Sequence, residues 1–115
     1  MTLADLQFKA RDKSIVATLT GEIDLSNADN IGQALASRVS NQAFALIFDL
    51  THVDYLDSAA IQLIYRLRDR LQARGQALKL VIPRSSPADD ALRLAGVARH
   101  LETLETVEAA LVAVG

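Results

Sequence analysis

The sequence has no cysteine and no tryptophan, and aromatic residues make up only 4% of its 115 positions. The absence of cysteine excludes disulfide bonds, thiol catalysis and thiolate metal ligands, and it fits a reducing compartment. A core without many large rings has to be built from leucine, isoleucine, valine and alanine. Hydrophobic residues make up 50% of the chain, and a chain of this length can bury such a core without disulfides or metals.

Neither sign of charge dominates, because 12 basic and 14 acidic residues give a net charge of −2. The sequence lacks the basic arm or the mixed basic and aromatic patch that marks nucleic-acid binding. Its apolar runs are too short to span a bilayer, and residues 1–9 contain no apolar region of the signal-peptide type. We therefore expect one cytoplasmic domain over residues 1–115, with no nucleic-acid partner and no direct membrane insertion.

The strongest local pattern begins at residues 44–48 (FALIF), an uninterrupted apolar run. Such a run is typical of a strand buried on both faces of a parallel sheet. After it we expect a loop that carries three carboxylates and ends at Asp57 and Ser58. Either side chain can accept a hydrogen bond from the first free N–H groups of a helix. The loop also contains three apolar residues, which either fold under it or form a docking surface: Val53, Tyr55 and Leu56.

A helix follows this loop. The residues that define its apolar face recur at spacings of four, three and four, and they are Ala60, Ile64, Leu67 and Leu71. Gly75 provides the stop. The helix also carries four arginines interleaved with an acid. We interpret them as a solvated face, with the alternative that Arg66 and Arg70 contact a partner, since residues four apart share one side of a helix.

The rest of the chain predicts strands that alternate with helices. The predicted strands are residues 5–10, 15–20, 77–82 and 101–104, and the other helices begin at Ser26, Ser86 and Thr106. The resulting order is ββαβαβαβα, which is typical of an α/β sandwich with right-handed crossovers. We expect a mixed, mostly parallel sheet of about five strands packed with about four helices.

Ligands of open α/β sheets dock outside the carboxyl ends of the strands, so we expect the working site beside Asp57. Asp49, Asp54 and Asp57 suggest a carboxylate cluster for Mg²⁺, but such a site needs an acidic pair after an earlier strand and a lysine after a later one. The loop of Glu22 and Asp24 matches that pattern poorly. The sequence also lacks a glycine-rich phosphate loop and a nucleophile with its base. We predict no catalytic residue, no metal site and no cofactor.

Three segments form an ordered set of motifs: residues 21–24 (GEID), 46–51 (LIFDLT) and 53–61 (VDYLDSAAI). Taken together they resemble the STAS domain, the family of bacterial anti-sigma factor antagonists, stressosome subunits and domains attached to anion transporters. Their order and spacing cover nearly the whole chain. The resemblance implies a binding module that regulates transcription through partner switching, rather than an enzyme.

In the family, the partner is an anti-sigma factor that is also a serine kinase, with a histidine-kinase-like ATPase fold. The resemblance implies that such a partner binds at the loop of Asp24 and at the start of the helix after Asp57. The residues expected to form this surface are Asp24, Leu25, Tyr55, Leu56, Asp57, Ser58, Ala59, Ala60 and Ile61. The sequence gives no oligomeric state.

One departure from the family pattern lies at Ala59. Antagonists are phosphorylated on the second hydroxyl of an Asp-Ser-Ser-Gly-type run, and here Asp57 and Ser58 match its first two positions, whereas alanines occupy the other two. Alanine has no oxygen that accepts phosphate, so the usual switch, which adds a charge of about −1.5 to −2, is lost at Ala59. Phosphorylation of neighbouring Ser58 is an alternative that we carry as a minor hypothesis.

Two other functions stay open. A STAS subunit that docks on an ABC-transporter ATPase of the lipid-transport type needs no phosphorylation, which agrees with Ala59. A nucleotide- or anion-binding sensor would use the helix N-terminus at residues 57–59. The carboxylate of Asp57 argues against the sensor, because its charge competes with an anion.

Overall fold

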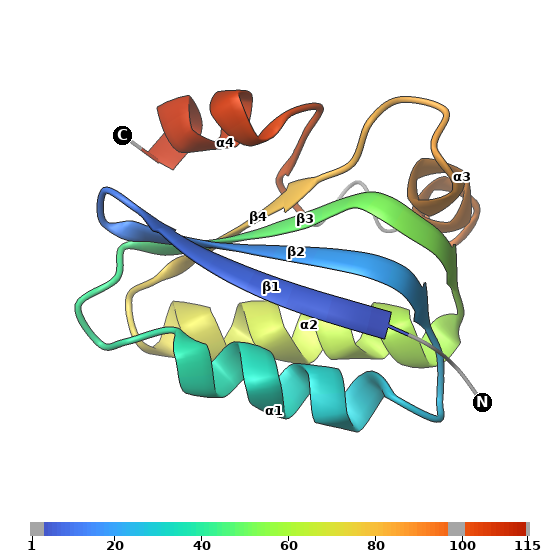
Figure 1. Cartoon of the computed structure of the whole chain (residues 1–115), viewed down its shortest axis with the longest axis horizontal. Coiled ribbons are helices and arrows are strands. Elements are labelled where there is room, and N and C mark those ends of the chain that lie inside the picture. Colours follow the sequence, from blue (N-terminus) through green and yellow to red (C-terminus); the bar gives the residue numbers. More distant parts are fainter. Residues whose placement is uncertain (1–3, 97–100, 115) are drawn as a thin grey trace.

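The computed structural model describes residues 4–96 and 101–114. These residues form a five-stranded sheet and four helices (Figure 1). The elements in chain order are β1 (Ala4–Arg11), β2 (Ser14–Ile23), α1 (Ala28–Arg38), β3 (Ala45–Leu56), α2 (Ser58–Ala73), β4 (Ala77–Val81), α3 (Pro87–Leu94), β5 (Thr103–Leu104) and α4 (Val107–Val114). The predicted order and the predicted mixed sheet are confirmed. In the described part of the chain, no helix is long and apolar enough to cross a membrane.

The strands lie in the order β1-β2-β3-β4-β5, so each strand neighbours the next one in the sequence. β1 is antiparallel to β2, and the other neighbouring pairs are parallel. The central position of β3 explains its apolar sequence, because both of its edges and both of its faces are covered. Parallel pairing also places the carboxyl ends of β2, β3 and β4 together at the same end of the sheet.

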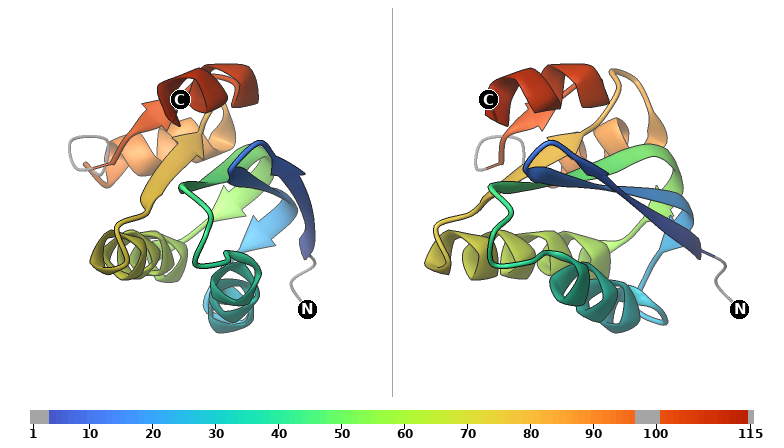
Figure 2. Two further views of the ribbon diagram at one scale, coloured as in Figure 1. Left: turned by 90° about the vertical axis from the view of Figure 1, so that its left-hand side faces the viewer. Right: turned by 60° about the vertical axis from the view of Figure 1, so that its left-hand side comes forward.

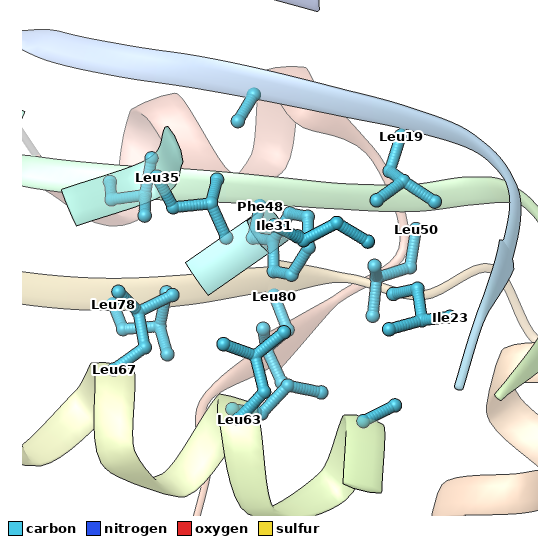
Figure 3. Packing of buried hydrophobic residues seen from close by; sticks show 14 of the residues in the cluster. Leu19, Ile23, Ile31, Leu35, Phe48, Leu50, Leu63, Leu67, Leu78 and Leu80 are labelled. Atoms are coloured by element: carbon cyan, nitrogen blue, oxygen red, sulfur yellow. The ribbon is translucent and has the colours of Figure 1, made fainter. Parts of the chain in front are cut away.

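The helices form layers on both sides of the sheet. α1 and α2 cover one face, α4 lies over the other, and α3 lies near the carboxyl ends of the strands (Figures 1 and 2). The larger core lies between the sheet and the α1–α2 layer, where Phe48 is fully buried among aliphatic side chains (Figure 3). A smaller core under α4 contains Val16, Ile47, Val81 and Ala110.

The expected loop after residue 48 is wrong, because β3 continues to Leu56. Two register shifts interrupt its pairing with β2, one between Thr18 and Thr20 and one between Gly21 and Glu22. At each shift β3 has one more residue than β2 does, which is the arrangement of a β-bulge. The bulges change which residues face the core, so the sequence loses the alternation that identifies a strand. Gly21, with φ of +117°, lies at the second shift. β2 continues past this glycine and ends at Ile23, three residues beyond the predicted end of the strand at residue 20.

The ends of two helices decide the shape of the site. Asp57 is the N-cap of α2, and the predicted inward face, Ala60, Ile64, Leu67 and Leu71, is buried. Gly75, with φ of +73°, follows the C-cap as predicted. The predicted N-cap Ser26 of α1 is wrong: the N-cap is Asn27, and it makes no side-chain cap bond.

Candidate functional site

Asp57 joins the two segments that the sequence analysis placed in the site. Its Oδ1 accepts hydrogen bonds from the backbone N–H groups of Ala59 (2.9 Å) and Ala60 (3.1 Å), which fixes the first turn of α2. Its Oδ2 accepts a third bond from the N–H of Leu25 (3.2 Å), which lies in the loop before α1. The backbone of Asp57 also donates to the carbonyl of Ile23 (3.2 Å). One carboxylate therefore holds the β2–α1 loop against the start of α2.

The β2–α1 loop is shaped by its own side chains. Oδ1 of Asp24 accepts a hydrogen bond from the N–H of Ser26 (2.9 Å), and the Ser26 hydroxyl donates to the same oxygen. Asn27 accepts a bond from the N–H of Asp24 (3.0 Å) and donates to the carbonyl of Glu22 (2.9 Å). The sequence analysis did not single out Asn27. Its signal is that a short amide side chain can bond to nearby backbone groups in a turn.

Two large apolar side chains stay exposed beside this junction. Leu25 is 83% exposed and Tyr55 is 52% exposed, although the sheet has two buried cores in which such residues usually lie. Ser58, the first residue of α2, is also exposed. Single exposed apolar side chains are common on protein surfaces, whereas a group of them can mark a surface that another molecule covers. Leu25 and Tyr55 are candidates for such a group because of their place beside the Asp57 junction.

Two expected surface residues do not present their side chains. Leu56 is 5% exposed, because β3 turns it into the core next to the outward Tyr55. Ala60 is completely buried on the inner side of α2. Ala59 and Ile61 are partly buried and pack against the same core, so each shows only part of its side chain. The open question about the apolar trio is also answered, since Val53 and Leu56 are buried and Tyr55 is not.

The three aspartates of β3 and the α2 cap do not gather into a metal site. Asp49 is 8% exposed, and its Oδ1 accepts hydrogen bonds from the N–H and the hydroxyl of Thr51. Asp54 is exposed, and Asp57 is occupied with backbone N–H groups. Among the described residues, no three His, Cys, Asp or Glu side chains lie close enough to hold a metal ion.

The arginines of α2 point in several directions, as expected of a solvated face. Arg66 and Arg70 line a shallow groove of about 310 Å³ between α1 and α2, together with Leu63 and Leu67. Arg66 lies 3.6 Å from the carboxylate of Asp29 on the opposite wall. Arg74 instead bonds to the carbonyl of Val39 at the far end of the helix. The groove begins at Ala28, next to the β2–α1 loop.

Comparison with known proteins gives a consistent result. The STAS domain model matches residues 5–110. The anti-sigma-F factor antagonist RsfB of Mycobacterium tuberculosis is 28% identical over 100 residues, which cover 86% of this chain and 80% of RsfB. An anti-sigma factor antagonist from Mycobacterium paratuberculosis has the same fold, with a TM-score of 0.85 at 23% identity, covering 97% of this chain and 94% of that one.

The same fold also occurs in a sulfate transporter family protein from Wolinella succinogenes, with a TM-score of 0.75 at 16% identity over 92% of this chain and 88% of that one. These two solved structures share the fold at low identity, so the likeness to them concerns architecture. The family model spans most of the chain, from β1 into α4. The chain belongs to the STAS domain family.

Proposed function

We propose that this domain is a non-enzymatic regulator of transcription in the cytoplasm, which binds and sequesters an anti-sigma factor of the histidine-kinase-like ATPase fold. The proposal is supported by RsfB, an anti-sigma-F factor antagonist whose similarity extends over 86% of this chain. The partner would contact the β2–α1 loop and the start of α2. The single observation that carries the proposal is the Asp57 junction, which holds exposed Leu25 beside the first turn of α2.

The proposed surface is narrower than the sequence suggested. Its side chains are Asp24, Leu25, Tyr55, Asp57, Ser58 and the exposed parts of Ala59 and Ile61. Leu25 and Tyr55 supply apolar contact area, and the two aspartates supply charge at the rim. A small residue at position 59 leaves the backbone of α2 open to close approach by a partner.

Ala59 gives the proposed binding a constitutive character. A phosphate at this position would place negative charge beside the Asp57 carboxylate, which already accepts the N–H groups of Ala59 and Ala60. Without an acceptor oxygen, the domain stays in the form that binds its partner. The regulatory step would then act on the partner or on the amount of this protein.

The test is a pull-down from a lysate of the native host, with bound proteins identified by mass spectrometry. The tagged wild-type domain should recover an ATPase of the histidine-kinase-like fold, and Ala59→Glu should lose it because a carboxylate then lies beside Asp57. Ala73→Glu is the matched control, since it makes the same change at an exposed position on the last turn of the same helix. Thermal unfolding of all three proteins checks that the fold is intact.

Equal recovery by wild type and Ala59→Glu would move the docking surface away from α2. Recovery of a transporter ATPase in place of the anti-sigma factor would replace the proposal with the transporter-subunit function. The anion sensor has less support, because Asp57 occupies the N–H groups that an anion would use. Titration with ATP or GTP in a calorimeter should therefore give no heat.

Ser58 is the alternative site of phosphorylation. Because Asp57 provides the cap, the Ser58 hydroxyl is not needed for it, and the side chain is exposed at the first position of α2. Phosphate on a peptide containing Ser58, isolated from the native host, would support a switch at this residue. Its absence in all growth states would leave the domain without one at the helix start.

A further inference from the structure

Among the described strands, β1 presents the longer of the two outer edges of the sheet. β1 has eight residues and pairs with β2 along its whole length, and it lies at the end of the strand order (Figure 1). Every second residue of such a strand directs its N–H and C=O groups away from its neighbour. The opposite edge, β5, has only two residues. A second strand therefore has one long edge to which it can add.

The two faces of β1 differ in chemistry. Leu6 and Phe8 pack against the larger core, next to α1, and the Phe8 ring is covered by the guanidinium of Arg38, whose central carbon lies 4.4 Å from the ring centre. Side chains of a strand alternate between its faces. Asp5, Gln7 and Lys9 therefore project from the other face, where all three are exposed.

When two copies of β1 pair antiparallel, one register places complementary side chains opposite each other. With a two-fold axis at Gln7, Asp5 lies opposite Lys9 of the second copy, and Lys9 lies opposite its Asp5. On the other face, Leu6 lies opposite Phe8 in both directions, and apolar pairs of this kind stabilise a sheet. Each charge on one side of the axis meets the opposite charge, while both apolar residues meet apolar residues.

A neighbouring register, with the axis at Phe8, is less favourable. It places Asp5 opposite Arg11, but Arg11 already lies 3.6 Å from Glu108 of α4. It also places Leu6 opposite the small Ala10, and Gln7 opposite Lys9. A register with the axis at Lys9 brings two lysines together, which is destabilising. Of these three registers, only the axis at Gln7 places Asp5 opposite Lys9, and it also pairs Leu6 with Phe8, so we take it as the favoured register.

We propose that the partner of β1 is a second copy of this chain, paired antiparallel in this register to form a continuous ten-stranded sheet across a two-fold axis. The pairing uses up the long edge of both copies, so the assembly closes as a dimer. The strand pair is smaller than a typical stable interface, and we therefore expect a dimer that dissociates on dilution. The site at Asp57 is on other elements and stays available in both copies.

Introduced cysteines test the register, because the native sequence has none. Residues opposite each other in an antiparallel pair have Cα atoms about 4.5–5.5 Å apart, and a disulfide spans about 4.4–6.8 Å. Gln7→Cys should therefore form a disulfide-linked dimer in a glutathione buffer far faster than Ser37→Cys, an exposed control on α1. Equal rates for the two variants would overturn the proposal, and so would faster linkage of Phe8→Cys.

Exchange of the charges tests the proposal without cysteine. Asp5→Lys or Lys9→Asp alone sets like charges opposite each other twice, and each should weaken dimerisation about tenfold or more in sedimentation experiments. The double variant Asp5→Lys/Lys9→Asp should restore the wild-type dimer. Both residues are exposed, so urea unfolding at low protein concentration should be nearly unchanged. A wild-type protein that stays monomeric at all concentrations, or a double variant without restored dimerisation, would overturn the proposal.

Discussion

Two polar side chains fasten loops at opposite ends of the sheet, and they differ in exposure. At the amino ends of β3 and β4, Gln76 is 5% exposed, and its Nε2 donates to the carbonyls of Ser40 (2.7 Å) and Ala43 (2.9 Å). At the carboxyl ends, Asp57 is only partly buried and accepts three backbone hydrogen bonds. Both side chains hold together segments that are more than thirty residues apart.

The surroundings of the two side chains differ. Beside Gln76, the ring of Phe44 is 56% exposed, and the ammonium of Lys13 lies over it, 4.7 Å from the ring centre. Beside Asp57, the side chain of Leu25 is 83% exposed. We call the amino end the closed end, because a cation of the same chain lies over its exposed ring, and the carboxyl end the open end. We infer that the same kind of polar fastening serves stability alone at the closed end and presents a binding surface at the open end.

The core beneath both ends should give the largest loss of stability. Ile64 is fully buried on the inner face of α2, and Ile64→Ala should lower the free energy of unfolding by about 2–5 kcal/mol in urea denaturation. Gln62→Ala is the control, since Gln62 is exposed on the same helix. A loss within the error of measurement would contradict the packing of α2 on the sheet.

Substitution at the closed end should cost less and should spare binding. Gln76→Leu keeps the approximate volume but removes the side-chain donor from the buried carbonyl of Ala43 and from the carbonyl of Ser40, which still accepts the N–H of Ala43 (3.2 Å). Leaving a buried group unsatisfied costs about 1–3 kcal/mol. The Oε1 of Gln76 is itself buried without a partner among the described residues. Because Gln76→Leu also removes this unsatisfied atom, we expect a loss of stability near the lower end of that range. Reduced recovery of the partner by a folded Gln76→Leu would contradict the separation of the two ends.

Substitution at the open end should affect stability less and binding more. Asp57→Ala removes the cap of α2 and should cost about 0.5–2 kcal/mol. Asp57→Asn keeps one oxygen that accepts the N–H groups of Ala59 and Ala60, and asparagine is a comparable N-cap, but its amide nitrogen cannot accept the N–H of Leu25. Asp57→Asn should therefore bind the partner more weakly while unfolding at nearly the wild-type urea concentration. Wild-type binding by Asp57→Asn would show that neither the charge of Asp57 nor its bond to Leu25 contributes to docking.

This contrast also explains what the sequence can predict. The apolar periodicity of α2 and the uninterrupted run of residues 44–48 report burial directly, so the element order was predicted correctly. The bulges of β3 destroy the periodicity that would have extended the strand to Leu56. Without that extension, Leu56 was expected on the surface with Tyr55, although neighbouring strand residues face opposite sides.

The helix cap at the proposed site was predicted for a different reason. A helix cap is a local signal, so Asp57 was found, whereas its bond to Leu25 joins residues that are distant in the sequence. Ser26 was expected to cap α1, but it bonds to Asp24, and its neighbour Asn27 takes the cap position. Choices among several adjacent polar side chains depend on the tertiary position of the loop, which composition and spacing do not contain.

Asp89, near the carboxyl ends of the strands, gives the smallest expected change in stability, and this change should depend on pH. The N–H of Ser85 (2.9 Å) and the side chain of Arg93 donate to Asp89, and together they lower the pKa of its carboxyl group below the ordinary 3.8. A group whose pKa is lower in the folded state stabilises the fold above its unfolded pKa and loses this contribution as the pH falls through the folded value. Asp89→Asn should therefore lower the urea midpoint slightly at neutral pH and match wild type in strong acid. Asp90→Asn is the control. Asp90 is an exposed neighbour that accepts no such backbone bond within the described residues, so this variant should differ from wild type less. An equal response of both variants would mean that the effect comes from net charge and not from the bond between Asp89 and Ser85.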